Sequence, residues 1–392
     1  MTSSNVVMLA PVLPCRNADN AGTRYVHEVA SWMRSRTDLV VITPEGLSVS
    51  RSLASGGVPK HIILSHPESG GTSRVAQRLR EVFSPDLPAR AWAHALATNA
   101  AVQALVARAE VVDLQWSAQA NLVPAIRRIN PHARIVCTVH DVMSQRFGRM
   151  RDAAKDAPRR LRWAYARRRA LESERTMSNS VDVIAVLSAK DADLLPRGRA
   201  EIVVVTPPLA RGASPRADRH RRADLLLVSM LARWENEEGL LWFFEEVLPL
   251  IRREVPDVRF RVAGLGIRPH VAEAAKKARI DLLGFVDDLE PLYDEAAAVV
   301  VPLRLGAGVK FKVVDALVRG VPVVTTPVGA EGIGTDAWFA GVHSDPAAFA
   351  AAVVEVLTDP GPAEHRAAAA RTEALGAFGQ EQFEQSMRKI YG

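Results

Sequence analysis

Two glycines and two lysines stand close together between an apolar run and a helical pattern. They are Gly306, Gly308, Lys310 and Lys312. Glycine lets the backbone approach a ligand closely, and the free N–H groups at the start of a helix attract phosphate. The two lysines add mobile positive charge. We therefore predict a phosphate-binding loop at 302–312, with a tight turn flanked by solvated lysines as the alternative.

An acidic residue follows this loop inside the helix expected at 310–319. Gly308, Lys312 and Asp315 have the i, i+4 and i, i+3 spacings that place residues on one helix face. A carboxylate one turn inside a phosphate-binding helix is well placed for ribose hydroxyls. Asp315 is therefore the predicted ribose ligand.

Two loops of the first half also carry groups that could bind or react. Asn20 could cap a helix whose first turn contains Gly22, offering N–H groups to an anion, although a capped helix without ligand is equally compatible. His140 ends the strand expected at 134–139, beside Asp141, which could orient its imidazole or cap the next helix. The alternative for His140 is a buried histidine bonded to its neighbours.

Weaker patterns occur in two loops of the second half. Gly264 and Gly266 end a strand, where chain reversal alone would explain them. Asp287 and Asp288 resemble paired metal-binding carboxylates, but they precede a helix, so capping is favoured and no metal is predicted. Patterns typical of serine hydrolases, zinc proteases and P-loop NTPases do not occur.

The elements that must position these residues alternate along most of the chain. Strands are expected at 6–10, 39–43, 62–64, 111–114, 134–139, 183–186, 225–229, 259–263, 280–283, 299–302 and 321–325. Helices are expected at 22–35, 74–83, 92–108, 123–129, 238–255, 271–278, 289–297, 310–319 and 347–358. Buried strands alternating with helices predict parallel sheets covered by helices on both faces.

A Pro-, Arg- and Ala-rich stretch at 211–224 has linker composition, so the chain divides into two halves. The predicted fold class is α/β, with two Rossmann-like, doubly wound domains facing a cleft. The predicted domains are 1–208, with a C-terminal helix at about 376–392 packing back on it, and 209–375. Ligands of such sheets bind at the carboxyl ends of the strands.

Composition limits the class of protein. The 392 residues are 48% hydrophobic and 24% charged, which excludes a disordered or collagen-like chain. The sequence contains no apolar stretch of membrane-spanning length, and its two cysteines are far apart, so a cytoplasmic enzyme without a disulfide framework is expected.

The formal net charge of +6 arises mainly in one segment. Residues 142–175 contain eleven Lys or Arg and four Asp or Glu. A local excess argues against a general nucleic-acid-binding surface. The segment between Arg146 and Arg175 is either a surface helix that packs Leu161, Tyr165 and Leu171 inward, or a contact for an anionic membrane surface or a phosphorylated acceptor.

The second half of the sequence resembles the nucleotide-sugar glycosyltransferases with two Rossmann-like domains (GT-B), particularly retaining family 4, also called glycosyl transferases group 1. The branch with a Gly-x-Gly-x-Lys loop matches best. The likeness is specific over 225–335 and looser in the first half. Residues that carry it are Ser229, Asn236, Trp242, Pro249, Phe260, Gly264, 283–288, Tyr293, Pro302, Gly306, Gly308, Lys310, Lys312, Asp315, Gly320, Pro322, Thr326, Gly329, Glu331, Asn20–Arg24, His140, Asp141, Glu172, Glu174 and 182–184.

This resemblance implies transfer of a sugar from a nucleotide-diphosphate donor to an acceptor hydroxyl, with retention of configuration. The nucleotide-sugar is a co-substrate, and neither a metal nor another cofactor is expected. The implied catalytic residues are His140, beside the sugar or acceptor, and Lys310. The implied donor-binding residues are Asn20, Gly22, Arg233, Gly264, Gly266, Phe285, Val286, Gly306, Gly308, Val309, Lys312 and Asp315, of which 284–286 would contact the nucleobase through the backbone.

The sequence departs from the family pattern at the donor site. Asp315 replaces the second of two glutamates that the family normally spaces eight residues apart, and Ala307 stands at the first. The usual Arg and Lys of the diphosphate clamp fall near Met230 and Glu238. Arg233, Lys310 and Lys312 could replace their charge.

These departures keep other functions open. A non-catalytic GT-B protein that activates a partner enzyme is one alternative, and a nucleotide-sugar epimerase of the same fold is another. The Ala- and Arg-rich composition is typical of a GC-rich bacterial genome. Cell-envelope polysaccharide or glycolipid synthesis and secondary metabolism are the pathways considered.

Overall fold

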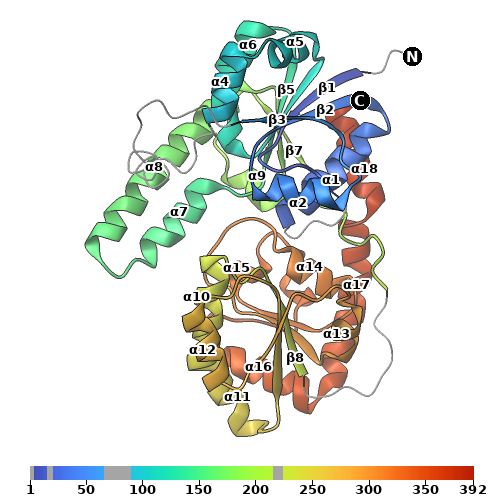
Figure 1. The fold of residues 1–392 in the computed structure, drawn as a ribbon. Coiled ribbons are helices and arrows are strands. Elements are labelled where there is room, and N and C mark those ends of the chain that lie inside the picture. The colour runs from blue at the N-terminus through green and yellow to red at the C-terminus, as the bar shows by residue number, and fades with distance from the viewer. Residues whose placement is uncertain (1–3, 16–20, 66–89, 215–223) are drawn as a thin grey trace. The chain divides into compact units, whose positions relative to one another are not determined.

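The computed structural model describes residues 4–15, 21–65, 90–214 and 224–392 (Figure 1). The chain separates into two compact units. The N-terminal unit comprises Met1–Pro207 together with Phe383–Gly392, and the C-terminal unit comprises Pro208–Gln382.

The N-terminal unit is built on a parallel sheet of seven strands in the order β3-β2-β1-β4-β5-β6-β7. Its central strands are rich in Val, Ile and Leu and are buried on both faces, as expected of a sheet between two helical layers. The strands are β1 (Ser4–Leu9), β2 (Thr37–Pro44), β3 (Lys60–Leu64), β4 (Val111–Gln115), β5 (Arg134–Val139), β6 (Val183–Val186) and β7 (Glu201–Val204).

Helices flank this sheet on both faces (Figure 1). They are α1 (Ala21–Arg34), α2 (Leu47–Ser55), α4 (Arg90–Thr98), α5 (Ala100–Arg108), the 3₁₀ helix η1 (Ser117–Leu122), α6 (Val123–Ile129), α7 (Met143–Asp152), α8 (Ala157–Ser180), α9 (Ala189–Leu194) and α18 (Gln380–Tyr391).

The C-terminal unit has a parallel sheet of six strands in the order β10-β9-β8-β11-β12-β13. The strands are β8 (Asp224–Val228), β9 (Arg259–Ala263), β10 (Asp281–Gly284), β11 (Ala298–Val301), β12 (Val323–Thr325) and β13 (Gly341–Val342). The helices are α10 (Trp234–Trp242), a π-helical turn (Phe243–Val247), α11 (Leu248–Glu254), α12 (Pro269–Lys277), α13 (Glu290–Glu295), α14 (Phe311–Leu317), α15 (Pro327–Ala330), η3 (Asp336–Trp338), α16 (Pro346–Thr358) and α17 (Pro360–Ala377).

The predicted α/β fold class with two doubly wound sheets is confirmed. Because all strands of each sheet are parallel, the loops that follow them gather at one edge of that sheet. The candidate residues His140, Gly264, Gly306 and Lys310 all lie in such loops.

Some local predictions were wrong. The helix expected at 92–108 is two helices, because the Asn99 side chain accepts hydrogen bonds from the N–H groups of Ala101 (3.0 Å) and Val102 (3.1 Å) and so starts a new helix. The short edge strand β13 was not predicted. The helix expected at 74–83 lies outside the described residues.

Helices α7 and α8 form a hairpin that extends from the sheet of the N-terminal unit (Figure 1). The two helices pack through Phe147, Ala166, Ala170 and the partly buried Trp163. The prediction that Leu161 and Tyr165 pack inward was wrong: their exposed fractions are 74% and 48%.

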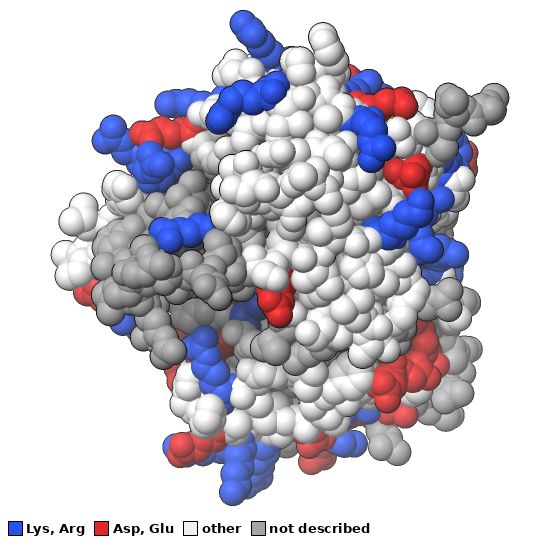
Figure 2. Space-filling model, turned by 45° about the horizontal axis from the view of Figure 1, so that its top comes forward, with Lys and Arg blue, Asp and Glu red and all other residues white. Residues whose placement is uncertain are grey.

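On the face drawn in Figure 2, the described lysines and arginines are interspersed with acidic residues and with uncharged areas. The excess positive charge of the sequence therefore does not form one continuous surface on that face.

Helix α18 supplies the last element of the N-terminal unit. Phe383, Met387 and Ile390 are buried. Ion pairs join Glu384 to Arg36 of the α1–β2 turn (3.5 Å) and Lys389 to Glu201 of β7 (3.1 Å).

Candidate functional site

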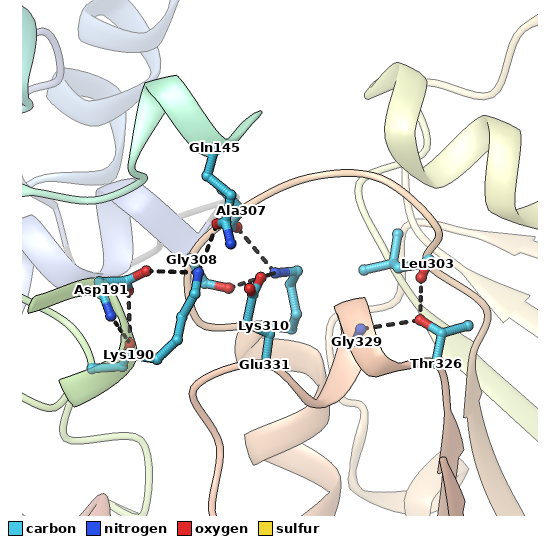
Figure 3. A network of polar contacts seen from close by, with 11 residues as sticks. Gln145, Lys190, Asp191, Leu303, Ala307, Gly308, Lys310, Thr326, Gly329 and Glu331 are labelled. Carbon is cyan, nitrogen blue, oxygen red and sulfur yellow. Dashed lines mark hydrogen bonds and ion pairs between the residues drawn. The ribbon is translucent and has the colours of Figure 1, made fainter. Parts of the chain in front are cut away.

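The loop between β11 and α14 has the conformation that its glycines permit. Gly306 and Gly308 adopt φ angles of 119° and 70°, in the left-handed region that other residues rarely enter. Lys310 occupies the cap position before α14, and its amine turns back to donate to the carbonyl oxygens of Ala307 (3.0 Å) and Gly308 (Figure 3). Glu331 lies 3.9 Å from the same amine.

Lys312 is also held in place. Its amine donates to Ser229 Oγ and to Asn236 Oδ1, both at 2.7 Å. Asn236 in turn donates to the Met230 carbonyl at 2.6 Å. The prediction of mobile lysines was therefore wrong, because both amines are anchored and Lys310 is only 9% exposed.

These contacts bring three predicted cations into one region of the C-terminal unit. Burial, together with the nearby charges of Arg233 and Lys310, lowers the pKa of Lys312 to about 7. Neither Ser229 nor Asn236 was singled out as a site residue, although both carry the family resemblance. Gly308 lies in the loop, so the expectation that it shares a helix face with Lys312 and Asp315 was wrong.

The low pKa of Lys312 predicts a pH-dependent affinity for anions. Below pH 7 the amine is charged, and above it the amine is neutral, so binding of an anion must then be accompanied by proton uptake. We expect the Kd of a bound nucleoside diphosphate to rise by up to about tenfold per pH unit above pH 7, until the pKa of the complex is reached. Isothermal titration between pH 7 and 9 avoids titration of the phosphate itself, whose second pKa is about 6.

The matched variant is Lys312→Met, which should bind more weakly at pH 7 and lose most of the dependence on pH. A wild-type Kd that stays constant from pH 7 to 9 would contradict the assignment.

Asp315 lies one turn into α14 and is engaged by an ion pair. Its Oδ1 is 3.7 Å from Arg319 Nη1, and Arg319 also pairs with Glu290 at 2.6 Å. The Arg319 guanidinium lies over the ring of Tyr293, 4.6 Å from its centre. A ribose would therefore meet a carboxylate whose position is already fixed, and the ribose role of Asp315 stays a prediction.

Gly264 and Gly266 allow two neighbouring loops to approach. A Cβ added at Gly264 would lie 1.7 Å from the carbonyl oxygen of Ser229, and one at Gly266 would lie 2.5 Å from Ala232 Cβ. Hydrogen bonds join Ser229 N–H to Ala263 O (2.9 Å) and Gly264 N–H to Gly284 O (2.7 Å). The close approach at these glycines therefore keeps Ser229, which binds the Lys312 amine, beside the loop that follows β9.

The loop after β10 presents an aromatic ring to solvent. Phe285 is 61% exposed and follows Gly284, which has a φ of 67°. Asp288 accepts a hydrogen bond from the N–H of Glu290 (3.0 Å), which agrees with the capping interpretation. Phe285 and Val286 therefore occupy the carboxyl edge of the sheet, where their nucleobase role stays a prediction.

In the N-terminal unit, His140 is buried at the end of β5. Its Nε2 lies 3.0 Å from Gln115 Oε1, and its ring stacks on Trp116 with 3.9 Å between centres and 7° between planes. Tyr25 of α1 meets the same ring edge-on at 5.3 Å. Burial lowers the pKa of His140 to about 3, so the imidazole is neutral at physiological pH.

The other residues predicted in this unit are less informative. Gly22 is the second residue of α1, and Asn20 lies outside the described residues.

A further polar cluster at this edge was not predicted from the sequence. Lys190, after β6, donates to Gln145 Oε1 (2.6 Å) and to Asp191 Oδ1 (3.2 Å) (Figure 3). Ser188 caps α9 by accepting from the Asp191 N–H and donates to Asp191 Oδ2 (2.8 Å). The Ser-x-x-Asp spacing is a helix-start signal that could have identified the cluster.

Among the described residues, no group of three or more His, Cys, Asp or Glu side chains could hold a metal ion. None of the helices within these ranges is both long and apolar enough to cross a bilayer.

The family model described as glycosyl transferases group 1 matches residues 222–359. An uncharacterized 44.6 kDa protein in the cps region of Klebsiella pneumoniae is 34% identical over 122 residues, which are 29% of this chain and 31% of that protein. Glycogen synthase of Mycobacterium tuberculosis is 28% identical over 217 residues, 53% of this chain and 52% of that enzyme. The chain thus spans about a third to a half of the length of these relatives.

Solved structures match over nearly the whole chain. Sucrose-phosphate synthase of Thermosynechococcus elongatus superposes with a TM-score of 0.70 at 14% identity, covering 99% of this chain and 98% of that one. HepE of Anabaena, solved in complex with UDP and glucose, has a TM-score of 0.68 at 12% identity and covers 99% of both chains. Residues 222–359 of the C-terminal unit are therefore similar to the glycosyl transferases group 1 family, within a chain that has the GT-B fold.

Proposed function

We propose that the chain is a retaining glycosyltransferase that moves a sugar from a nucleotide-diphosphate donor to an acceptor hydroxyl. The observation that carries this proposal is the cluster of Arg233, Lys310 and Lys312 at the carboxyl edge of the sheet in the domain that matches the family. Two of these cations are fixed before a ligand arrives, so they can stabilise charge without reorganising.

In this proposal the C-terminal unit binds the donor. The diphosphate contacts Gly306, Gly308, Val309 and the cationic cluster, Asp315 binds the ribose, and residues 284–286 contact the nucleobase. The diphosphate gains negative charge as it leaves, so its stabilisation by these lysines is the main catalytic contribution. Anchoring by Ser229 and Asn236 supplies the pre-organisation that the missing Arg and Lys clamp would otherwise provide.

The N-terminal unit supplies the acceptor side in this proposal. His140 at the end of β5 contacts the transferred sugar or the acceptor, and Gly22 contributes backbone N–H groups to the diphosphate. Because its pKa is low, the imidazole of His140 is neutral and does not take up a second proton. In this proposal it therefore acts by hydrogen bonding.

The structure of HepE with UDP and glucose makes UDP-glucose the first donor to test. The experiment is a thermal shift of the purified protein against UDP, GDP, ADP, CDP and dTDP, with and without EDTA. We expect one nucleotide to raise the Tm selectively, with no effect of EDTA. The matching nucleotide-sugar is then assayed for transfer to candidate hydroxyl acceptors.

A non-catalytic partner protein is the second candidate, because Ala307 and Met230 stand where the family places a glutamate and an arginine. Absence of any nucleotide-dependent stabilisation would favour it. Conversion of free nucleotide-sugars without an acceptor would instead identify an epimerase.

We further propose that the α7–α8 hairpin contacts an anionic membrane surface, on the cytoplasmic side. Leu161 and Tyr165 are exposed on α8 among Arg159, Arg160 and Arg162. Exposed apolar side chains flanked by arginines are typical of segments that insert into lipid headgroups.

We expect the protein to float with vesicles that contain anionic lipid and not with neutral vesicles. The double variant Leu161→Ser, Tyr165→Ser should lose most of this binding, because it removes the inserting side chains and keeps the charge. Leu53→Ser, which alters an exposed leucine of α2, is the matched control. Equal recovery of wild type with and without anionic vesicles would refute the membrane contact.

A further inference from the structure

A continuous path of hydrogen bonds leads from a buried carboxyl group to His140. Asp113 of β4 is fully buried, and its Oδ2 lies 2.9 Å from Gln115 Nε2. Gln115 Nε2 also donates to Thr138 Oγ1 at 3.3 Å, and Gln115 Oε1 lies 3.0 Å from His140 Nε2. All these residues belong to the adjacent strands β4 and β5 or follow them directly.

The carboxylate of Asp113 determines which groups along this path donate and which accept. An ionised carboxylate only accepts hydrogen bonds, so Asp113 turns the NH₂ group of Gln115 toward itself. The amide oxygen of Gln115 then faces His140 and accepts from it. Nε2 of His140 must therefore carry the hydrogen, which leaves the lone pair of Nδ1 unused by Gln115. Among the described residues, the hydrogen bond of the His140 ring is the one between Nε2 and Gln115.

Aromatic groups fix the plane of the same imidazole. Trp116 stacks on it, and Tyr25 meets it edge-on. Trp116 has a φ of 74°, which is unusual for a bulky residue, and its N–H donates to the Thr138 carbonyl at 2.9 Å. The unusual backbone conformation of Trp116, held at the end of β4, therefore places its indole against the His140 ring.

We propose that Gln115, oriented by Asp113, and Trp116 are positioning residues that hold His140 as the Nε2–H tautomer, with Nδ1 presented as an acceptor for a substrate hydroxyl. The tautomer follows from this chain's own contacts, whereas the contact with a substrate hydroxyl rests on the proposed function. Such an arrangement orders one lone pair without a charge, which suits a group that must align a hydroxyl.

The test is long-range ¹H–¹⁵N correlation spectroscopy of histidine-labelled protein, with the His140 signals assigned by their loss in His140→Gln. Spectra are recorded at pH 8.5, above the pKa of about 7 to which burial raises the Asp113 carboxyl, so that this group is ionised. We expect wild type to show a protonated Nε2 and an unprotonated Nδ1. A protonated Nδ1 would overturn the proposal, whatever the activity.

Variants separate positioning from simple packing. Gln115→Leu should lose the fixed tautomer and lower kcat about tenfold or more, as loss of residues that orient a functional histidine does. Gln115→Glu should keep the wild-type tautomer. One proton shared between the new carboxyl group and Asp113 leaves a second carboxyl oxygen, which accepts from His140. Asp113→Asn should give a mixture, since an amide can face Gln115 with either end.

The control is Gln119→Leu. Gln119 is another buried glutamine, and it lies on η1. Its spectrum should match wild type, and an equal loss of the tautomer there would reduce the effect to general packing.

Addition of UDP-glucose and of UDP then identifies the source of the hydroxyl. A shift of Nδ1 with UDP-glucose alone assigns it to the donor sugar. An unmoved Nδ1 in both complexes, with saturation shown by thermal shift, excludes the donor sugar as the source of that hydroxyl. If the tautomer is found but no nucleotide binds, the proposed function fails while the positioning of His140 stands.

Discussion

Replacement of Lys310 by alanine is expected to lower the rate of sugar transfer on the order of 10²-fold or more, as loss of one pre-organised charge at a leaving group often does. The Lys310 amine is nearly buried and already bound to the carbonyls of Ala307 and Gly308, so it is in position before the donor arrives. Alanine would remove this charge and also the contacts that order the loop. The measurement is kcat and KM for the donor with the purified variant.

Two variants make this result interpretable. Lys277→Ala removes an exposed lysine of α12, whose side chain is 76% exposed, and should leave the rate unchanged. Lys310→Arg keeps the charge in a larger, planar group and should recover only part of the activity. An unchanged rate in a well-folded Lys310→Ala protein would exclude the assigned role.

Gly264→Ala is expected to destabilise the C-terminal unit by about 3 kcal/mol or more, because it combines a steric conflict with backbone strain. The added Cβ would lie 1.7 Å from the Ser229 carbonyl oxygen, and Gly264 has a φ of 145°, which other residues rarely adopt. One of the two loops would have to move, and Ser229 would no longer hold Lys312. Urea unfolding followed by circular dichroism measures the loss.

The matched substitution is Gly376→Ala in α17. This glycine is exposed, has no atom near the position of an added Cβ, and lies in a helix. Alanine there should raise stability by about 0.5–1 kcal/mol. If both substitutions had the same small effect, the close approach of the loops at Gly264 would have no energetic importance.

Much of the fold was predictable because its signals are local. Buried strands such as β5 and β11 are short segments dominated by Val and other small or β-branched residues, and their alternation with helices defines the sheets. Gly306 and Gly308 were recognisable because their positive φ angles require glycine.

The rest depends on contacts between residues distant in sequence. Lys312 is anchored by Ser229 and Asn236, which lie 83 and 76 residues away, and His140 is oriented by Gln115, 25 residues before it. Spacing along the chain contains no information on such pairs. It predicted a mobile lysine, and it offered Asp141 either as the group that orients His140 or as a helix cap, where the structure has an anchored amine and a glutamine partner for His140.

The prediction that Leu161 and Tyr165 pack inward was wrong for a different reason. A helical pattern predicts which residues share a face, but the face that is buried depends on what packs against it. In α8 that face contains Ala166 and Ala170, and Leu161 is left in solvent.

The position of α18 has a consequence for the order in which the chain folds. The N-terminal unit includes Phe383–Gly392, which are synthesised only after the whole of Pro208–Gln382. Until Phe383 and Met387 emerge from the ribosome, the surface that they cover stays exposed, although most of that unit has long been made. Contacts such as that between Arg36 and Glu384 also close a loop of nearly the whole sequence, which slows their formation. The C-terminal unit, being continuous, is therefore the first that can complete its own structure during synthesis.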